Sequence, residues 1–234
     1  MKTKQIYYTE PYRKTLTCNV IDVKMGDNLT DVVLDQTIFY PEGGGQPSDK
    51  GLLGEAKVVY VRLIDGEIVH QIKGRIEKDQ KVQANINWDR RYKYMKRHTA
   101  GHVLHDVLMT MTNKIIPIRG GHGNKAFLEY QGVVNSDIKS ELEAEINRVI
   151  QQDLSVITSE TTQEELIRDC KFVLLNLPKS KKLRMIKIGE FPPMPDGGIH
   201  VKSTKEIGQI WISSISAQEN KTTIRYGVTS NPEK

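Results

Sequence analysis

The sequence predicts an α+β fold in which a small β-barrel-like domain over residues 1–88 is followed by a two-layer α/β domain over residues 89–234. Up to residue 88, short runs of β-branched residues alternate with glycine-containing turns, a pattern typical of a small barrel or curled sheet. At Asp89 the apolar period becomes helical, and helices and strands then alternate. The boundary therefore depends on a change of period, because no linker-like stretch separates the two parts.

The N-terminal part reads as strands joined by short turns. Asp65-Gly66 separates two β-branched runs, and an Asp-Gly pair in that position is a strong hairpin signal. We expect strands at residues 15–23, 30–35, 37–40, 56–63, 67–72 and 81–88.

The C-terminal part opens with a helix over residues 89–112, in which Met95, Val103, Val107 and Met111 are among the apolar positions. A loop should follow at residues 115–123, which contain Pro117 and several glycines. We expect strands at 126–130, 154–158 and 182–188, a hairpin of 207–212 with 222–226, and helices at 162–168 and from Ser136, the candidate N-cap, to Asp153.

Composition excludes several classes of protein. The 234 residues are 38% hydrophobic and 27% charged, and they contain no apolar run long enough to cross a membrane. The N-terminus lacks an apolar signal core, so a cytoplasmic location is expected. Cys18 and Cys170 are far apart, which predicts two free thiols rather than a disulfide framework. A net charge of +5 is compatible with a phosphate-bearing partner without requiring one.

His98 and His102 stand four residues apart in the helix expected at 89–112. Residues i and i+4 share one helix face with their Cβ atoms about 5–6 Å apart, so both imidazoles can face one metal ion. The His-Glu-x-x-His motif of metalloproteases places a glutamate base directly after its first histidine. Here that position is Thr99, so the pair lacks the protease base.

Asp196 and His200 form a second pair with the same spacing, separated in part by Gly197-Gly198. Glycines make a helix unfavourable here, but they can turn the chain so that both side chains face one point. Together the two pairs offer three imidazole nitrogens and one carboxylate. This set suits one zinc ion per chain in tetrahedral coordination.

Three motifs resemble one family. Residues 98–102, His-Thr-Ala-Gly-His, resemble the His-Thr-Ala-x-His motif of the alanyl-tRNA synthetase editing domain, which belongs to the threonyl and alanyl-tRNA synthetase second additional domain family. Residues 39–49 resemble the glycine-rich motif upstream of it, and residues 195–201 take the place of its Cys-Gly-Gly-Thr-His motif. In this order the motifs are specific, and the chain resembles the free-standing alanyl-tRNA editing proteins of the longer AlaX type.

The resemblance implies a hydrolase that removes serine, and in some members glycine, from wrongly charged tRNA(Ala). A synthetase pocket cannot reject a near-isostere by binding alone, so a second hydrolytic site is needed. The family's zinc ligands correspond to His98, His102 and His200. Our hypothesis for the mechanism is that zinc positions and acidifies a bound water, or orients the aminoacyl group, and that water attacks the ester carbonyl carbon.

The chain departs from the family at Asp196, which replaces the usual cysteine, and at Ile199, which replaces a threonine. A carboxylate can bind zinc, although it donates less than a thiolate and admits harder ions such as manganese. Alternatively, three histidines and a water form an open site with Asp196 as a nearby base. Loss of activity is a third interpretation.

Other residues have a functional and a structural interpretation each. Glycine-rich residues next to Gln46 serve either a turn or the aminoacyl end of the substrate, and Thr99 bonds either the substrate or its own backbone. His105 could join the metal face, but a packed or solvated role is expected. His122 could line the pocket, but a position on a surface loop is expected. The candidate substrate-binding residues are Gly44, Gly45, Gln46 and Thr99, and the candidate tRNA-binding residues are Arg90, Arg91, Arg97, Lys181 and Lys182.

Two further functions stay open at this stage. One is a different zinc hydrolase acting on small esters or amides, and the other is a non-catalytic tRNA-binding module. The sequence predicts no membrane partner. It leaves open the choice between serine and glycine and between a monomer and a homodimer.

Overall fold

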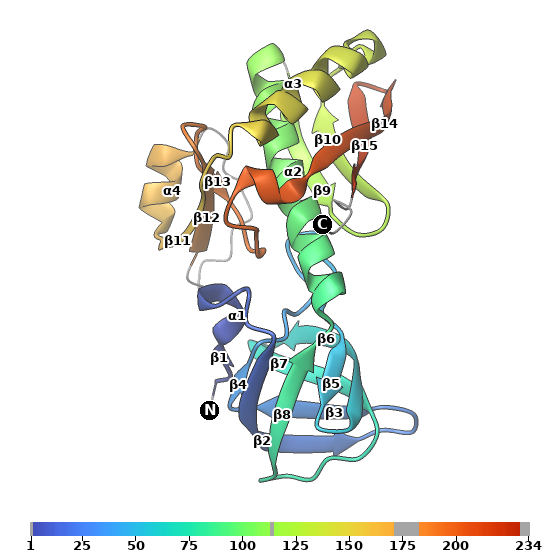
Figure 1. Cartoon of the computed structure of the whole chain (residues 1–234), viewed down its shortest axis with the longest axis vertical. Coiled ribbons are helices and arrows are strands. Elements are labelled where there is room, and N and C mark those ends of the chain that lie inside the picture. The colour runs from blue at the N-terminus through green and yellow to red at the C-terminus, as the bar shows by residue number, and fades with distance from the viewer. Residues whose placement is uncertain (1, 113–114, 171–182, 230–234) are drawn as a thin grey trace. The chain divides into compact units, whose positions relative to one another are not determined.

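A computed structural model describes residues 2–112, 115–170 and 183–229 of the chain, shown in Figure 1. It confirms a mixed helix-and-sheet protein. The chain divides into two compact units, Met1–Tyr94 and Met95–Lys234, and the division falls inside helix α2 (Trp88–Met111). None of the helices in the described ranges is both long and apolar enough to cross a membrane.

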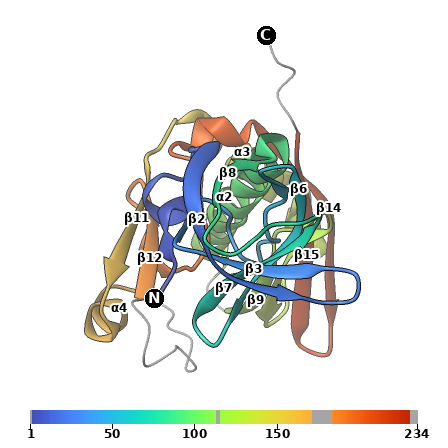
Figure 2. The ribbon, with the colours of Figure 1, turned by 90° about the horizontal axis from the view of Figure 1, so that it is seen from below.

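The first unit contains a ring of paired strands in the order β2-β3-β7-β6-β5-β8, which closes because β8 also pairs with β2. Figure 2 shows the long β2–β3 hairpin in blue. Along β2, exposed and buried residues alternate at first, as expected where one sheet face covers a core. The elements are β1 (Lys4–Gln5), α1 (Ile6–Thr9), β2 (Thr15–Met25), β3 (Thr30–Leu34), β4 (Gln36–Thr37), β5 (Gly51–Leu53), β6 (Ala56–Ile64), β7 (Glu67–Lys73) and β8 (Lys81–Ile86).

The hairpin predicted at Asp65-Gly66 is confirmed. Ile64 pairs with Glu67, and the two residues between them have φ angles of 49° and 85°. A two-residue turn with positive φ at both positions matches the twist of the flanking strands, which is why Asp-Gly occurs there.

The strand expected at residues 37–40 is mostly absent. Regular pairing is limited to β4, which pairs in parallel with β1. The amide of Phe39 donates instead to the Thr37 hydroxyl (3.0 Å), and the amide of Tyr40 donates to the Asp49 carboxylate (2.7 Å). Side chains thus take the hydrogen bonds that a strand ladder would need.

The second unit contains a four-stranded antiparallel sheet, in the order β14-β15-β10-β9, and a three-stranded sheet, β11-β12-β13. Helix α3 packs on β14, where the Asn147 side chain bonds both the amide and the carbonyl of Ile210. The remaining elements are β9 (Ile116–Gly121), β10 (Ala126–Gln131), η1 (Ser136–Ile138), α3 (Lys139–Gln151), β11 (Val156–Thr161), α4 (Gln163–Asp169), β12 (Leu183–Ile188), β13 (Met194–Pro195), η2 (Thr204–Ile207), β14 (Gln209–Gln218) and β15 (Lys221–Thr229).

The prediction of a loop at residues 115–123 is wrong in part, because strand β9 forms there. Pro117 signalled a break, but β9 lies at the edge of its sheet, where a residue without an amide proton is tolerated. Gly121 faces Phe127 across the pair, and a Cβ at Gly121 would come within 2.6 Å of that ring. Local propensity therefore gave way to packing against β10.

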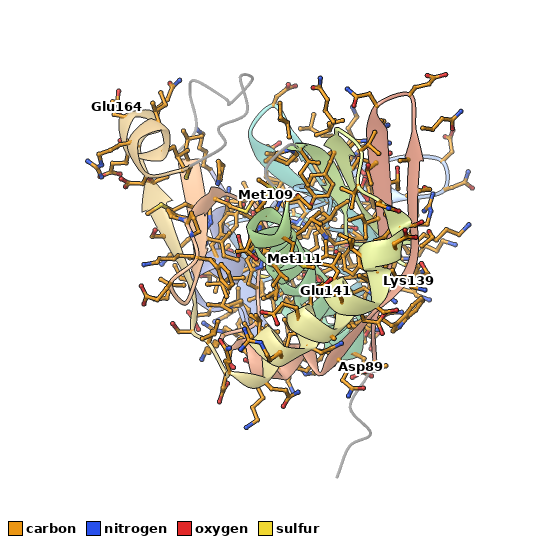
Figure 3. The ribbon with its side chains drawn as sticks, turned by 90° about the horizontal axis from the view of Figure 1, so that it is seen from above. Asp89, Met109, Met111, Lys139, Glu141 and Glu164 are labelled. Atoms are coloured by element: carbon orange, nitrogen blue, oxygen red, sulfur yellow. The ribbon has the colours of Figure 1, made fainter. Side chains whose placement is uncertain are left out.

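The ends of two helices show how local chemistry sets the boundaries. Thr162 caps α4, and its reciprocal bonds with Glu165 form a capping box. Before α3, the cap of the first turn is Asn135 rather than the predicted Ser136. Figure 3 labels Glu141 on α3 and Glu164 on α4, two exposed residues whose side chains point away from the core.

Candidate metal centre

Helix α2 presents His98 and His102 on one face, one turn apart. Their Nε2 atoms lie 3.1 and 3.4 Å from the same oxygen, Oδ1 of Asp196. Both side chains are largely buried. The i,i+4 spacing therefore directs both imidazoles to one point, as the sequence predicted.

The other half of the site follows strand β13. The second carboxylate oxygen of Asp196, Oδ2, lies 2.7 Å from His200 Nε2 and accepts a hydrogen bond of 2.7 Å from the Gly198 amide. One ligand atom from each of His98, His102, Asp196 and His200 can be chosen so that all four lie within 4.8 Å of one another. The structure therefore brings together all four residues that were predicted as metal ligands.

The turn between Asp196 and His200 forms without the unusual backbone angles that we expected of its glycines. Neither Gly197 nor Gly198 has a positive φ, and a Cβ at Gly197 would meet open space. The bond from the Gly198 amide to Asp196 closes the turn instead. The prediction of the turn is confirmed, but its physical reason was wrong.

Burial and charge prepare these side chains to bind a cation. Burial lowers the pKa of His98 and lowers that of His200 to about 3, so both imidazoles are neutral at pH 7. Burial alone would raise the pKa of Asp196, but the neighbouring His98 and His200 hold it well below its usual range. Neutral imidazoles and an ionised carboxylate are the protonation states that a metal ion requires.

Thr99 orients His200 rather than facing outward. Its hydroxyl donates to the Met95 carbonyl (3.0 Å), so its oxygen accepts from the Val201 amide (3.3 Å) and from Nδ1–H of His200 (3.2 Å). We assign the Nδ1–H tautomer to His200, because the single hydroxyl proton is already used. Nε2 then keeps its lone pair for a metal, an arrangement typical of metal-binding histidines.

His122 is the residue that the sequence analysis placed wrongly, on a surface loop. It is buried, and its ring stacks on that of His98 with a centroid distance of 4.0 Å. The Tyr226 hydroxyl donates to the Arg97 carbonyl (3.0 Å), and it lies 2.7 Å from Nδ1 of His122, which donates to it. Tyr226, from β15, thus positions His122, from the segment after β9, against the ring of the candidate ligand His98.

Gly101 provides the space for His122. A Cβ at Gly101 would lie 2.6 Å from the Tyr226 hydroxyl and 2.8 Å from Cε1 of His122. Glycine costs a helix interior about 1 kcal/mol relative to alanine, so its presence between His98 and His102 has a packing reason. The sequence did contain this signal, since a glycine inside a helical pattern suggests close approach by another group.

Gly101→Ala tests this packing, because its effect on stability should change sign with the background. In the wild type we expect a loss of about 1–2 kcal/mol, since overpacking outweighs the gain in helix propensity. In a His122→Ala, Tyr226→Phe background, the same change should stabilise the protein by up to about 1 kcal/mol. Urea unfolding of both pairs measures this difference, with Gly197→Ala as the control in open space. Equal effects in the two backgrounds would contradict the packing argument.

The residues present fit a metal ion such as zinc. Three nitrogens and one carboxylate oxygen form a common zinc ligand set. Nε2 of His102 is buried and has no hydrogen-bond partner among the described residues, although it lies 3.4 Å from Asp196. A buried nitrogen that lacks a partner is unfavourable, and a bound cation would provide one.

The other predicted site residues lie in several settings. Gly44 and Gly45 have φ angles of 55° and 72° in a turn closed by Gly43 and Gln46, and the Gln46 side chain is buried. The turn accounts for the glycines structurally. A substrate role for Gln46 remains a proposal. Arg90 bonds the Ser48 carbonyl, Arg97 bonds the Gly123 carbonyl, and Lys181 and Lys182 lie outside the described residues.

The expectation that Arg91 binds tRNA is corrected by the structure. Its side chain is fully buried in the first unit, where it pairs with Asp49 and donates to the carbonyls of Pro11 and Ile38. A guanidinium enclosed in this way has no surface to offer a phosphate. A run of basic residues in a sequence does not show that one of them turns inward.

Fold and site together define a mixed helix-and-sheet protein with a buried cluster of three histidines and one aspartate. Two family models match the chain: tRNA synthetases class II (A) over residues 8–90, and threonyl and alanyl tRNA synthetase second additional domain over residues 183–225.

Three relatives define the family further. The chain is 33% identical over 229 residues to the alanyl-tRNA editing protein AlaX-M of Methanosarcina barkeri, covering 88% of this chain and 90% of the relative. It is 32% identical over 231 residues to AlaX-M of Saccharolobus solfataricus, covering 94% of each. It is 36% identical over 216 residues to AlaX-L of Pyrococcus horikoshii, covering 88% of this chain and 53% of the relative, so it spans about half of that protein. The chain belongs to the AlaX family of alanyl-tRNA editing proteins.

Proposed function

We propose that this chain is a trans-editing hydrolase that deacylates tRNA(Ala) mischarged with serine or glycine. The observation that carries the proposal is the gathering of His98, His102, Asp196 and His200 in one buried cluster, in a chain whose relatives are named alanyl-tRNA editing proteins. We propose that the cluster holds one zinc ion and that residues 89–234 form the editing domain. The net charge of +5 is compatible with a tRNA partner.

A zinc ion in this cluster would act as a Lewis acid at the ester carbonyl and lower the pKa of water. The chain's own residues then have separate tasks. The three imidazoles direct their Nε2 atoms at one point, and Thr99 holds the His200 ring in the required tautomer. Water adds to the carbonyl carbon. The ester bond to the ribose then breaks, and the ribose oxygen takes up the proton that the water gives up.

Asp196 has two candidate roles at this site, either as a fourth metal ligand or as a general base. Its Oδ1 faces both helix histidines and its Oδ2 faces His200, which supports the role of a fourth ligand. The alternative is a base beside a three-histidine metal. Its ionised state serves either role, because its pKa lies well below the usual range despite its burial.

Deacylation of Ser-tRNA(Ala) and Gly-tRNA(Ala) by the purified protein tests the proposal. We expect hydrolysis of mischarged tRNA and little of Ala-tRNA(Ala), and a loss of at least roughly 100-fold in His98→Ala and His102→Ala, because each removes a candidate ligand. Lys139→Ala, at the start of α3 and outside the cluster, is the matched control and should keep full activity.

Three results would contradict the proposal. Unchanged rates in both histidine variants would exclude the metal-centred account. Equal activity on free aminoacyl esters would instead indicate a hydrolase of small esters. Stoichiometric metal and tight tRNA binding without hydrolysis would indicate a non-catalytic tRNA-binding module.

A further inference from the structure

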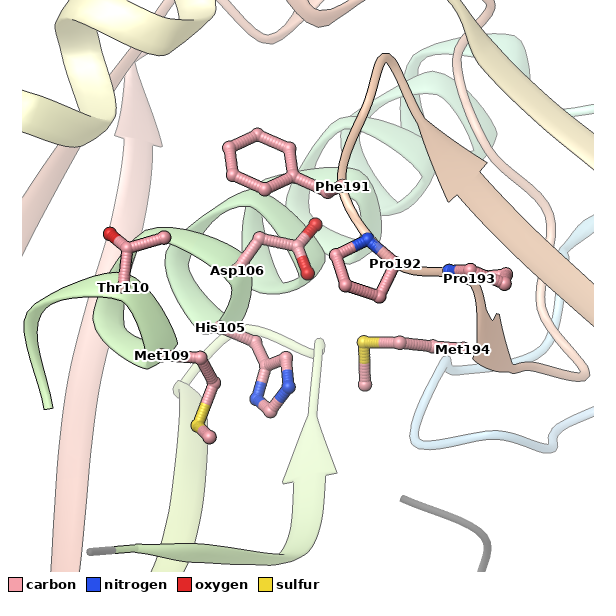
Figure 4. Close-up of a pocket in the computed structure, with 8 residues that line it drawn as sticks. All are labelled: His105, Asp106, Met109, Thr110, Phe191, Pro192, Pro193 and Met194. Atoms are coloured by element: carbon pink, nitrogen blue, oxygen red, sulfur yellow. The ribbon is translucent and has the colours of Figure 1, made fainter. Parts of the chain in front are cut away.

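A small pocket lies beside the metal cluster, between the second half of α2 and the turn that leads into β13. Figure 4 shows its walls: one side comes from α2 and the other from the proline-containing turn. The α2 wall contains Asp106, one helical turn after His102 and on the same face. The lining residues are His105, Asp106, Met109, Thr110, Phe191, Pro192, Pro193 and Met194.

The carboxylate of Asp106 has no hydrogen bond or ion pair with any residue that the structure describes, although the residue is only 7% exposed. Figure 4 shows it directed from α2 toward the turn, near Pro192. A carboxylate with so little exposure and no partner is disfavoured in its ionised form. A cation bound beside it would supply the counter-charge that stabilises the ionised form.

The neighbouring His105 does not supply that counter-charge. The His105 ring is buried against Tyr130, with Nδ1 3.3 Å from the Tyr130 hydroxyl, and burial lowers the pKa of His105 to about 4, so the ring is neutral. Burial raises the pKa of Asp106 itself to about 7, with a smaller opposite effect from His102. The ionised form of Asp106 is therefore disfavoured in the free protein, and a cation in the pocket would favour it.

The lining selects the kind of ligand. Met109, Phe191, Pro192 and Met194 offer no charge, and an aromatic face and thioethers tolerate a cation well. A carboxylate repels phosphate. A second metal ion would need more ligands, and the only metal-capable group in the described ranges is the one at His98, His102, Asp196 and His200. A primary ammonium group, which offers three hydrogen-bond donors, is the cation that fits.

We propose that Asp106 binds the α-ammonium group of the aminoacyl moiety while the ester carbonyl lies at the metal cluster. This inference rests on the proposed function and deepens it. In an aminoacyl ester the ammonium nitrogen lies two bonds from the carbonyl carbon, and this length plus a hydrogen bond of about 3 Å to Asp106 covers the roughly 5.4 Å of one helical turn. Serine and glycine share this ammonium, so one pocket would select α-amino acid esters without distinguishing the two.

A pair of non-hydrolysable ligands tests the proposal independently of catalysis. One is tRNA(Ala) whose 3′ end has serine in amide linkage, and the other is the same tRNA with glyceric acid, in which a hydroxyl replaces the ammonium. We expect the wild type to bind the seryl ligand roughly tenfold more tightly, as a charge-assisted hydrogen bond provides. Asp106→Asn, which keeps the shape and removes the charge, should bind both ligands equally.

Two further variants sharpen this comparison. Met109→Lys places a tethered ammonium in the pocket, so it should also lose the preference for the seryl ligand. Glu141→Gln removes a carboxylate from the exposed face of α3 and should keep the preference.

A wild type without a preference, or Asp106→Asn or Met109→Lys proteins that keep it, would overturn the assignment of Asp106. Failure of the proposed function would appear elsewhere, as absent hydrolysis of Ser-tRNA(Ala) by a wild type that still shows the binding preference.

Discussion

Asp196→Asn is expected to weaken metal binding by more than the roughly 10–100-fold that the loss of an outer hydrogen-bonding partner costs. The amide keeps the size of the carboxylate but removes the charge that faces His98, His102 and His200 at 2.7–3.4 Å. Hydrolysis of Ser-tRNA(Ala) should fall with the metal content. Competition with a coloured chelator and metal analysis by mass spectrometry measure the first effect, and the deacylation assay measures the second.

Asp196→Cys is the matched variant, because it introduces the cysteine of the motif that residues 195–201 resemble. A thiolate donates more strongly than a carboxylate, so we expect tighter zinc binding and a lower tolerance of manganese. Both effects follow only if position 196 binds the metal. An Asp196→Asn protein that keeps its metal but loses hydrolysis would instead assign Asp196 as a base, and one that keeps both would remove it from the site.

Arg91→Ala should destabilise the first unit by about 3–5 kcal/mol, the usual cost of breaking a buried ion pair by removing one partner. The change leaves Asp49 as an uncompensated buried charge and removes a donor from the carbonyls of Pro11 and Ile38. Arg13→Ala is the control, since it breaks the exposed pair with Glu10 and should cost at most about 1 kcal/mol.

The two tryptophans allow this effect to be assigned to one unit. Trp88 belongs to the first unit and Trp211 to the second, so a Trp211→Phe background leaves fluorescence that reports on the first unit alone. Urea unfolding in that background should show the midpoint shift for Arg91→Ala. A shift as small as that of Arg13→Ala would contradict the structural role assigned to Arg91.

The elements that could be predicted from the sequence depend on contacts between near neighbours. Asp65-Gly66 marked a hairpin because both residues accept positive φ. A helix was expected at residues 162–168, and the structure shows that it starts through bonds between Thr162 and Glu165, which span only three residues. The spacing of His98 and His102 likewise sets their common face through the helix period alone. For such features the cause lies within one turn of chain.

The features that were missed depend on residues far away in the sequence. The strand β9 forms because β10 pairs with it, and Arg91 is buried because it forms an ion pair with Asp49 in the interior of the first unit. His122 contacts His98 only because Tyr226, more than a hundred residues later, holds its ring. Periodicity and propensity contain no information on these partners.

The sequence by itself determined the candidate ligands, since their residue types and spacing define a donor set for one metal ion. It also determined the family, through three motifs, and the relatives confirm that family. Only the tertiary structure decided which groups surround that donor set: Thr99 behind His200, His122 on the face of His98, and Asp106 in the next turn of α2. The reason is physical, because spacing along a helix fixes direction over one turn, whereas the burial that shifts a pKa and orients a ring arises from segments that meet only when the chain has folded.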